Sequence, residues 1–344
     1  MSSPGTALTF VTVFYGAEMD LLRLQARSLA RRLDPDGVRG IVVIDNGWPP
    51  VPPAARNAIR TSYGPLADRV SFLRSRDVAA SAPATEGWRS QQLLKLLIAR
   101  RVETPYYVVL DAKNHLIGPA DLTTFVGPDG RAHLATHPYT THPLRAQLAT
   151  AVRYLGGDDD DVVAAESSSV PTATPFVMST QLTLDMMHDV ATTAGARFET
   201  IFERYGLTEF LLYGSWLDIR GPGRTTIYDG VDIPSPTVWP SRRSIAGVEA
   251  TIAEAEAAGS AFFAVHRQAL AKSNPEVRSR IAQFWASRGL FSGHQDAARF
   301  IRSFRRHYPA AMLATRAAER VRELTKAATP GARQLRGSTD PGPR

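Results

Sequence analysis

Short apolar runs alternate with amphipathic helical segments along the first third of the chain. Strands are predicted where β-branched and aromatic residues cluster between turn-forming residues, at 7–15, 40–45, 70–74 and 106–110. Helices are predicted between them, where leucines recur with a helical period, at 19–33, near 54–62 and at 88–101. This alternation is typical of a parallel sheet covered by helices, in which ligands bind at the carboxyl ends of the strands.

Beyond residue 116 the pattern becomes irregular. Helices are predicted at 144–155, 183–191, 208–218, 246–258 and 275–287, with an extended segment at 171–179 and a short strand at 261–265. The stretch 156–161 is interpreted as a solvated loop, because it contains four consecutive acidic residues that repel one another. A long helical segment follows at 296–326, and Pro309 is expected to interrupt it.

These segments predict one domain over residues 1–290, a helical extension over 291–328 and a disordered tail over 329–344. The tail contains little apolar surface and is rich in Pro and Gly, so it cannot bury enough to fold. The whole chain of 344 residues is 44% hydrophobic and 21% charged, which is ordinary for a globular protein. It has no cysteine, which excludes disulfides, thiolate metal sites and cysteine nucleophiles and fits a reducing, cytoplasmic compartment.

The net charge of +7 is concentrated at the C-terminal end. Residues 297–344 hold ten arginines and one lysine against three acidic residues, which is +8, so the preceding residues sum to −1. A basic segment of this kind is either a solvated helix face or a contact with an anionic membrane surface. We expect no nucleic-acid partner, and we expect a cytoplasmic protein, peripheral at the inner face of the membrane if the segment binds lipid.

Candidate ligand-binding residues follow three of the predicted strands. Tyr15 and Gly16 come after the first strand, Asp45 ends the second, and Asp111 stands directly after the run Tyr106–Leu110. Because the carboxyl ends of parallel strands meet at one edge of the sheet, these residues are expected to lie close together.

The predicted helix before Asp111 has a narrow polar stripe on an otherwise apolar surface. Trp88, Gln91, Gln92 and Lys95 fall on one side at about 100° per residue, and leucines cover most of the remainder. One interpretation is that Lys95 extends along the protein surface with its ammonium in water. The other is that the stripe lines a ligand cleft beside Asp111.

Five sequence segments, read in order, resemble the GT-A glycosyltransferases, and most closely a bacterial GT-A-like family of unknown function. The segments are VTVFYG, GWRSQQLLKL, YYVVLDAKNH, TEFLLYG and FFAVH, and the resemblance extends from about Thr9 to Leu290. It implies a Rossmann-type α/β fold with a mixed, mainly parallel sheet flanked by helices. It also implies transfer of a sugar from a nucleotide-diphosphate donor to a glycan or glycoconjugate acceptor, in the assembly of surface polysaccharide or glycoconjugates.

The resemblance also suggests how the diphosphate is held. GT-A enzymes use an Asp-x-Asp at a strand end to bind a divalent metal, and Asp111 matches the first Asp whereas Lys113 stands at the second. A lysine ammonium supplies part of the missing charge. Lys113 therefore either replaces the metal or leaves Mn²⁺ or Mg²⁺ to Asp111 and His266, with help from Asn114 or His115.

Further roles are implied by the same resemblance. Tyr15, Gly16 and Asp45 would lie near the nucleotide, and Gln92, Lys95, Lys113 and Asn114 would contact the donor sugar or its phosphates. Glu209, in the first turn of a helix that begins at Thr208, would be the general base of an inverting transfer. The alternative is that Glu209 only complements the helix dipole.

Two other functions remain open at this point. The same fold could belong to a non-catalytic nucleotide- or glycan-binding protein, with Lys113 marking a lost metal site. A nucleotidyltransferase would share the strand-end Asp and a basic residue near the phosphates. No GxGxxG, Walker or GxSxG motif is present, which disfavours dinucleotide-binding, NTPase and hydrolase functions.

Overall fold

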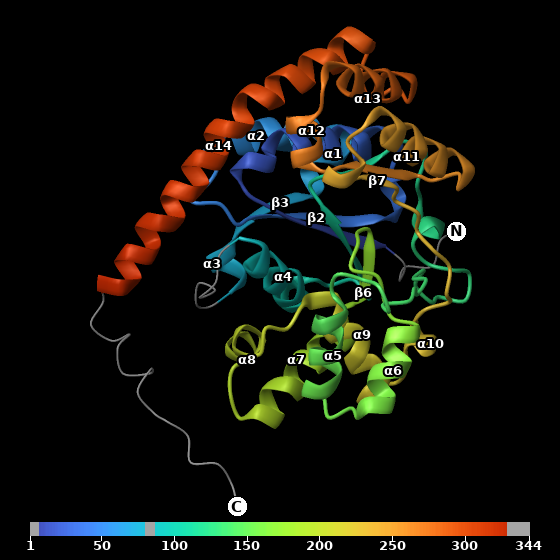
Figure 1. Cartoon of the computed structure of the whole chain (residues 1–344), viewed down its shortest axis with the longest axis vertical. Helices are drawn as coiled ribbons and strands as arrows, with labels where there is room; N and C mark the ends of the chain where they lie inside the picture. Colours follow the sequence, from blue (N-terminus) through green and yellow to red (C-terminus); the bar gives the residue numbers. More distant parts are fainter. Residues whose placement is uncertain (1–6, 80–86, 329–344) are drawn as a thin grey trace, which may run out of the picture.

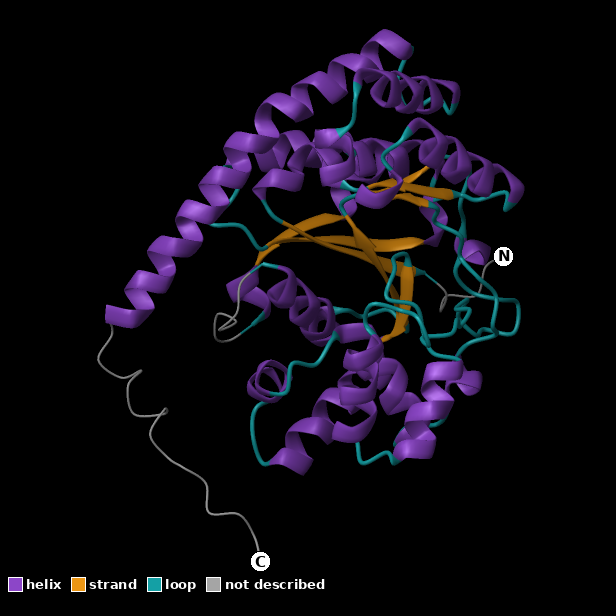
Figure 2. Ribbon diagram, viewed as in Figure 1, coloured by secondary structure: helices purple, strands orange, loops and turns teal. Residues whose placement is uncertain are grey.

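The computed structural model describes residues 7–79 and 87–328 and has the predicted mixed, mainly parallel sheet flanked by helices (Figures 1 and 2). The central sheet has the strand order β3–β2–β1–β4–β6, in which the first four strands are parallel and β6 is antiparallel to β4. A second sheet has the order β5–β8–β7. The strands are β1 Leu8–Phe14, β2 Val38–Asp45, β3 Val70–Arg74, β4 Tyr106–Asp111, β5 Asn114–Leu116, β6 Phe176–Ser179, β7 Thr237–Val238 and β8 Phe262–Val265.

Helices cover both faces of the central sheet. In Figure 1, α1, α2 and α11–α13 lie above it and α4–α9 lie below. Among the described helices, none combines the length and the apolarity that crossing a bilayer requires. The helices are α1 Met19–Arg32, α2 Pro53–Ser62, α3 Ser75–Val78, α4 Trp88–Leu97, α5 Arg145–Tyr154, α6 Asp159–Ser167, α7 Thr180–Ala194, α8 Phe198–Arg204, α9 Glu209–Ile219, α10 Arg224–Ile227, α11 Ile245–Ala257, α12 Arg267–Lys272, α13 Pro275–Ser287 and α14 His294–Ala328.

Strand β1 is central because it is apolar on both faces. All seven of its residues are buried, as expected for a strand with neighbours on each side and helices above and below. Its register pairs Phe14 with Asp45 of β2 and Val13 with Asp111 of β4. The two acidic residues that end β2 and β4 therefore reach the same edge of the sheet, as the sequence predicts.

The predicted loop over 156–161 holds for residues 156–158 only, because helix α6 begins at Asp159 and contains the rest of the acidic run. Asp158 caps α6: its carboxylate accepts from the Asp161 N–H at 3.0 Å, and the Asp161 carboxylate accepts from the Asp158 N–H at 3.0 Å. Acidic residues are favourable in the first turn of a helix because its free N–H groups are partly positive. The like charges that repel in a loop are therefore stabilised by the helix end.

The interruption expected near Pro309 is also absent. Helix α14 continues through this residue, which costs the hydrogen bond that the missing proline N–H would give to the carbonyl one turn earlier. Pro309 is exposed, so water can satisfy that carbonyl, and the preceding turn is anchored by buried Phe304 and Tyr308. The predicted disordered tail over 329–344 lies outside the described residues.

Candidate functional site

The turn between β4 and β5 is held by a buried side chain of α1. Gln25 donates from its amide nitrogen to the carbonyls of Asp111 at 2.7 Å and Asn114 at 3.2 Å. Its amide oxygen accepts from the Thr12 hydroxyl of β1 at 2.9 Å. These bonds fix the backbone of the turn, so the side chains of Asp111 and Lys113 project from a rigid base.

Asn114 holds the same turn against two distant segments. Its oxygen accepts from the Asp111 N–H at 2.8 Å and the Thr174 hydroxyl at 2.7 Å. Its nitrogen donates to the Thr174 carbonyl at 2.8 Å and to Ser235 Oγ at 3.1 Å. An amide has two donors and two acceptor positions, and all four are engaged here. Asn114 therefore has no free group for a donor or a metal in this structure.

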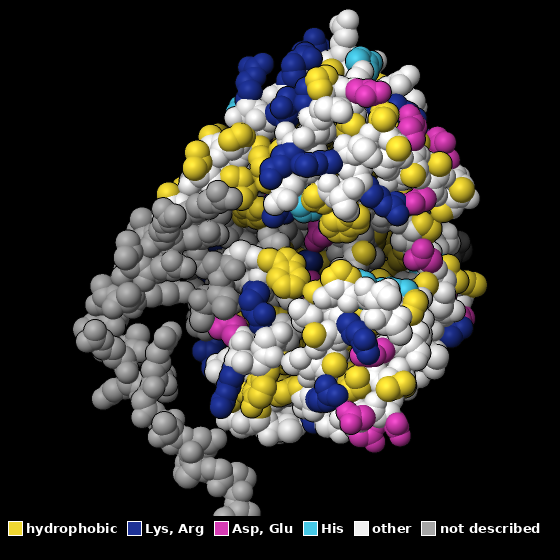
Figure 3. Space-filling model, viewed as in Figure 1, with side chains coloured by type: hydrophobic (Ala, Val, Ile, Leu, Met, Phe, Trp, Pro, Cys, Tyr) yellow, Lys and Arg dark blue, Asp and Glu magenta, His cyan; other side chains and the backbone are white. Residues whose placement is uncertain are grey.

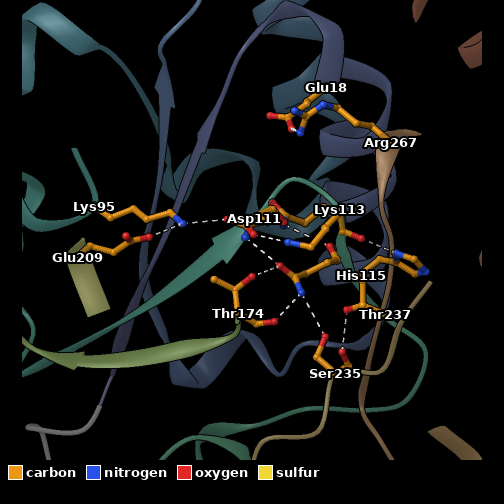
Figure 4. A network of polar contacts seen from close by, with 12 residues as sticks. Glu18, Lys95, Asp111, Lys113, His115, Thr174, Glu209, Ser235, Thr237 and Arg267 are labelled. Carbon is orange, nitrogen blue, oxygen red and sulfur yellow. Dashed lines mark hydrogen bonds and ion pairs between the residues drawn. The ribbon is translucent and has the colours of Figure 1, made fainter. Parts of the chain in front are cut away.

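A chain of ion pairs connects three elements at this edge of the sheet (Figure 4). Lys95 Nζ of α4 lies 3.0 Å from Asp111 Oδ1 and 3.2 Å from Glu209 Oε1 of α9. The Lys113 ammonium contacts Asp111 Oδ2. Both oxygens of Asp111 are thus paired with ammonium groups, and Lys95 joins the two carboxylates.

The pKa values follow from burial and from these pairs. Burial alone would raise the pKa of Asp111, but Lys113 and Lys95 hold it well below its usual range. Burial likewise would lower the pKa of Lys95, but Asp111 and Glu209 raise it. For Glu209, burial dominates and raises the pKa, although Lys95 opposes it. Asp111 is therefore a poor proton acceptor, whereas Glu209 is a better one.

A further ion pair closes the other side of the site. Arg267, the first residue of α12, lies 2.8 Å from Glu18 Oε1, and its guanidinium stands 5.3 Å from the centre of the Tyr15 ring. Burial raises the pKa of Glu18, against the effect of Arg267. Arg267 Nε is buried and has no hydrogen-bond partner in the part of the chain that the structure describes.

His266 and Trp239 border Lys113. The Lys113 ammonium lies 5.3 Å from the centre of the Trp239 ring, and the Trp239 and His266 rings are 5.6 Å apart. His266 Nδ1 accepts from the Gln268 N–H at 3.2 Å, so in the neutral ring the proton is on Nε2. Burial, together with Arg267 and Lys113, lowers the pKa of His266 to about 4.

These residues line one cleft at the carboxyl ends of β1 and β4. Figure 3 shows this face hollowed between the helices above and below, with acidic and basic side chains inside the hollow. The enclosed part has a volume of about 160 Å³, below the roughly 300–1,000 Å³ of a pocket that surrounds a whole small molecule. It therefore admits only part of a large ligand. Glu18, Asp111 and Glu209 line it with Lys95, Lys113 and Arg267, so the charges balance.

Besides Arg267 Nε, two buried polar atoms in the lining of this cleft have no hydrogen-bond partner among the described residues. They are Gln92 Oε1 of α4 and the hydroxyl of Thr208, which stands at the N-cap of α9 but makes no capping bond. Gln92 is 2% exposed and Thr208 is 3% exposed. A buried polar atom left unpaired costs roughly 1–3 kcal/mol. A ligand with hydroxyl groups would supply the missing partners.

The cleft contains some of the predicted site residues and not others. All four residues of the polar stripe line it, together with Asp111, Lys113, Glu209 and His266. Tyr15, Gly16, Asp45 and Asn114 are not in its lining. Asp45 is 2% exposed and its carboxylate accepts from the N–H groups of Gly47 at 3.0 Å and Val51 at 2.7 Å, so it orders the loop after β2.

Sequence reasoning missed Gln25, Glu18, Arg267 and Trp239. Gln25 had a detectable signal, because it is a polar residue on the leucine-rich face of α1. No signal in the sequence pointed to Glu18 or Arg267, since they are 249 positions apart and each is an ordinary charged residue beside a helix start.

The side chains as they lie form a poor donor set for a divalent metal ion, and the Mn²⁺ or Mg²⁺ site expected on Asp111 and His266 stays a prediction. Hard divalent cations need several oxygen ligands, but both oxygens of Asp111 are held by ammonium groups that would repel a cation. His266 uses Nδ1 as an acceptor and carries its proton on Nε2. His115 is also engaged at both nitrogens: Nδ1 with the Lys113 carbonyl at 3.1 Å, and Nε2 accepting from Trp285 at 2.9 Å.

Comparison with known proteins places the chain in a family. Residues 68–286 match the family of unknown function DUF6492, and the chain belongs to that family. This agrees with the family of unknown function expected from the order of the motifs. No curated protein matches the sequence.

Several solved glycosyltransferase structures are similar in part. An active-site mutant of LgtC is 12% identical with a TM-score of 0.41, covering 81% of this chain and 96% of its own. The bifunctional glycosyltransferase WbbM is 11% identical with a TM-score of 0.41, over 77% of this chain and 46% of its own. Mouse xyloside xylosyltransferase 1 is 10% identical with a TM-score of 0.40, over 75% of this chain and 97% of its own. At these TM-scores the likeness is too partial to indicate an activity, which must rest on the cleft itself.

Proposed function

We propose that this protein is a glycosyltransferase that transfers a sugar from a nucleotide-diphosphate donor to a hydroxyl acceptor without a bound metal ion. The observation that carries the proposal is the composition of the cleft. Lysine and arginine line the cleft around the strand-end turn, where a diphosphate needs positive charge, and the unpartnered polar atoms of Gln92 and Thr208 line the same cleft. A sugar diphosphate matches both features, because it combines an anionic group with several hydroxyl groups.

The cations would hold the diphosphate. Within the described ranges, Lys113 forms its ion pair with Asp111 alone. Asp111 keeps Lys95 as its second partner, so Lys113 can turn to a phosphate without leaving Asp111 unpaired. Arg267 and the Nε2–H of His266 would donate from the other side of the cleft. Positive charge held there stabilises the diphosphate as it leaves, which is where negative charge develops in the transition state.

Glu209 would be the general base. In an inverting transfer the bond between the anomeric carbon and the diphosphate oxygen breaks, and its electron pair stays on the diphosphate. The acceptor oxygen bonds to the opposite face of that carbon, and its proton passes to the Glu209 carboxylate. Burial raises the pKa of Glu209 and so improves it as an acceptor. Lys95, itself held by Asp111, fixes the orientation of the carboxylate.

A donor screen tests this function. Thermal unfolding is measured with UDP-, GDP-, CMP- and TDP-sugars, each with Mn²⁺ and with EDTA. A ligand at about 100 times its dissociation constant should stabilise the protein by about 2.7 kcal/mol. One class of donor should stabilise it equally under both conditions, and Lys113→Ala should weaken that effect.

The control variant is Lys272→Ala, which removes an exposed lysine outside the cleft. Stabilisation that requires Mn²⁺ would contradict the metal-free mechanism, and no response to any nucleotide-sugar would contradict the function.

A non-catalytic binding protein is the second candidate. It is favoured by the ion pair between Glu209 and Lys95. This pair stabilises the ionised carboxylate, and so opposes the uptake of a proton that a general base requires. Donor hydrolysis in the absence of acceptor separates the two, because a glycosyltransferase transfers slowly to water and a binding protein does not. Release of pyrophosphate from a nucleoside triphosphate would instead indicate a nucleotidyltransferase.

The acceptor and the cellular setting belong to the same proposal. A glycan or glycoconjugate would present the acceptor hydroxyl, in the assembly of surface polysaccharide. The basic segment that begins in α14 would bring the enzyme to the inner face of an anionic membrane.

A further inference from the structure

A second site lies outside the cleft, in an open groove that involves α1, α2, the loop before α14 and α14 itself. Arg23, Arg27 and Arg31 stand on successive turns of α1 and line the groove, and Arg299 of α14 also lines it. The groove has a volume of about 890 Å³. Four guanidinium groups from two helices therefore border one space, which we call the arginine groove.

The two carboxylates of the arginine groove form no ion pair with Arg23 or Arg27 among the described residues. Asp296 contacts Arg299, and Asp20 lies 3.6 Å from His307 of α14, although it also attracts Arg27. Among the described residues, no hydrogen bond or ion pair is formed by the side chains of Arg23 and Arg27. Arg23 Nε is buried without a partner.

This arrangement is unfavourable without a ligand. Like charges spaced four residues apart on a helix repel each other, and burial together with Arg23 and Arg31 lowers the pKa of Arg27. The groove is also lined by Leu290, Phe291 and Phe300, which exclude water from part of its surface. In such a surrounding, an anion is held more strongly than in bulk water. The guanidinium fork matches the oxygens of a phosphate group.

We propose that the arginine groove binds a phosphate group through Arg23 and Arg27, at a site separate from the cleft. The phosphate reaches it either as the headgroup of an anionic phospholipid or as part of a free phosphate compound. Both sources use the same guanidinium contacts, and the lining of the groove provides apolar surface for the rest of the ligand.

The test uses the full chain and two matched pairs of substitutions. Arg23→Gln with Arg27→Gln removes two charges from the groove. Arg101→Gln with Arg243→Gln removes two charges from exposed positions that line neither the groove nor the cleft and lie outside the basic segment 297–344. Binding is measured by co-sedimentation with vesicles of phosphatidylglycerol and phosphatidylcholine, with phosphatidylcholine vesicles as the reference. Calorimetric titration with pyrophosphate is done in a Lys113→Ala background, which lowers the affinity of the cleft for phosphate groups.

The groove variant should bind at least one probe about tenfold more weakly than wild type, and the control variant should differ from wild type by less than about threefold. Loss confined to vesicles identifies a lipid headgroup, and loss of pyrophosphate binding identifies a soluble phosphate. Failure of wild type to bind either probe overturns the proposal, as does an equal loss in the control variant.

A second variant keeps the test valid if the glutamine pair does not fold. Arg23→Lys with Arg27→Lys retains both charges and removes the guanidinium forks. Weaker binding of the probe than in wild type supports the site, and unchanged binding overturns recognition by the guanidinium groups.

Discussion

The cleft and the arginine groove are both built from charged side chains, yet they differ in how those charges are balanced. In the cleft, three cations and three carboxylates are paired with one another, and the local charge is close to zero. In the groove, Arg23 and Arg27 form no ion pair with any residue that the structure describes. The net charge of the chain therefore does not reveal where the cleft lies, although the cleft contains the proposed general base and the cations proposed to hold the diphosphate.

The two arrangements should bind anions in different ways. When an anion enters the cleft, a cation there exchanges a carboxylate for the anion. The affinity for the anion therefore depends on contacts at short range. An anion approaching the groove is attracted by uncompensated charge at longer range, and salt screens that attraction. The predictions that follow test this contrast.

The largest effect is expected for Glu209→Gln in the cleft. Removing the base should lower turnover by about 10²–10⁴-fold, while donor binding stays near normal because the amide keeps the shape of the side chain. Steady-state kinetics and donor titration measure the two effects separately. Glu276→Gln is the control, since Glu276 also lies in the first turn of a helix but is exposed.

The pH profile gives a second check on Glu209. Burial raises the pKa of Glu209 above the ordinary value of 4.5. As the pH is lowered, the base therefore becomes protonated, and wild-type turnover declines, before pH 4.5 is reached. This acidic limb should be missing from the residual activity of Glu209→Gln. Near-wild-type turnover in that variant would remove Glu209 from the proposed role.

The next effect is on stability. Lys95→Met leaves Glu209 buried without its cation and should lower the free energy of unfolding by about 3–5 kcal/mol. Arg23→Met in the groove should change it far less, because no ion pair is lost there. Urea denaturation of both variants measures the difference, and an equal loss in both would contradict the contrast between paired and unpaired charge.

A smaller effect of opposite sign is expected at Thr208. Thr208→Val replaces a buried hydroxyl that has no partner, so the free energy of unfolding should rise by about 1 kcal/mol. Donor binding should weaken, since the hydroxyl would no longer meet the sugar. Thr251→Val is the control, because the buried hydroxyl of Thr251 donates to the Gly247 carbonyl at 2.8 Å and its loss should destabilise the protein.

The smallest effect is that of salt on donor binding. Raising the salt concentration from about 0.05 to 0.5 M shortens the screening length to a few ångströms. Donor affinity in the cleft should change by less than about threefold, whereas phosphate binding in the groove should fall by about tenfold. Titrations at several salt concentrations measure both slopes, and equal slopes would show that the two sites do not differ in this way.

The sequence predicted the parts of this molecule that depend on local pattern. Strand β3 and helix α13 have the predicted bounds, because apolar periodicity and turn residues mark them directly. Helix α6 was missed because the acidic run was considered only as repelling charges and not as a cap and first turn. The continuation of α14 past Pro309 depends on tertiary contacts that no local pattern contains.

In the candidate site, too, the residues that a local pattern marks were predicted and the others were not. Lys95 and Asp111 were predicted together, because a polar stripe and a strand end lie 16 positions apart and are both visible in the sequence. Asp45 and Asn114 were expected near the donor, whereas the Asp45 carboxylate is engaged by its own loop and the Asn114 amide by the distant residues Thr174 and Ser235. The pairing of Glu18 with Arg267 requires the folded chain, since nothing in either segment points to the other.

The bonds of Asn114 also determine when the site is completed during synthesis. Its partners Thr174 and Ser235 come 60 and 121 positions later, so the floor of the cleft cannot close until residue 235 has left the ribosome. The parallel strands β1–β4 are all in place by residue 111 and can pair well before that point. A nascent chain that ends between these two positions contains the four parallel strands but not the residues that complete the floor of the cleft.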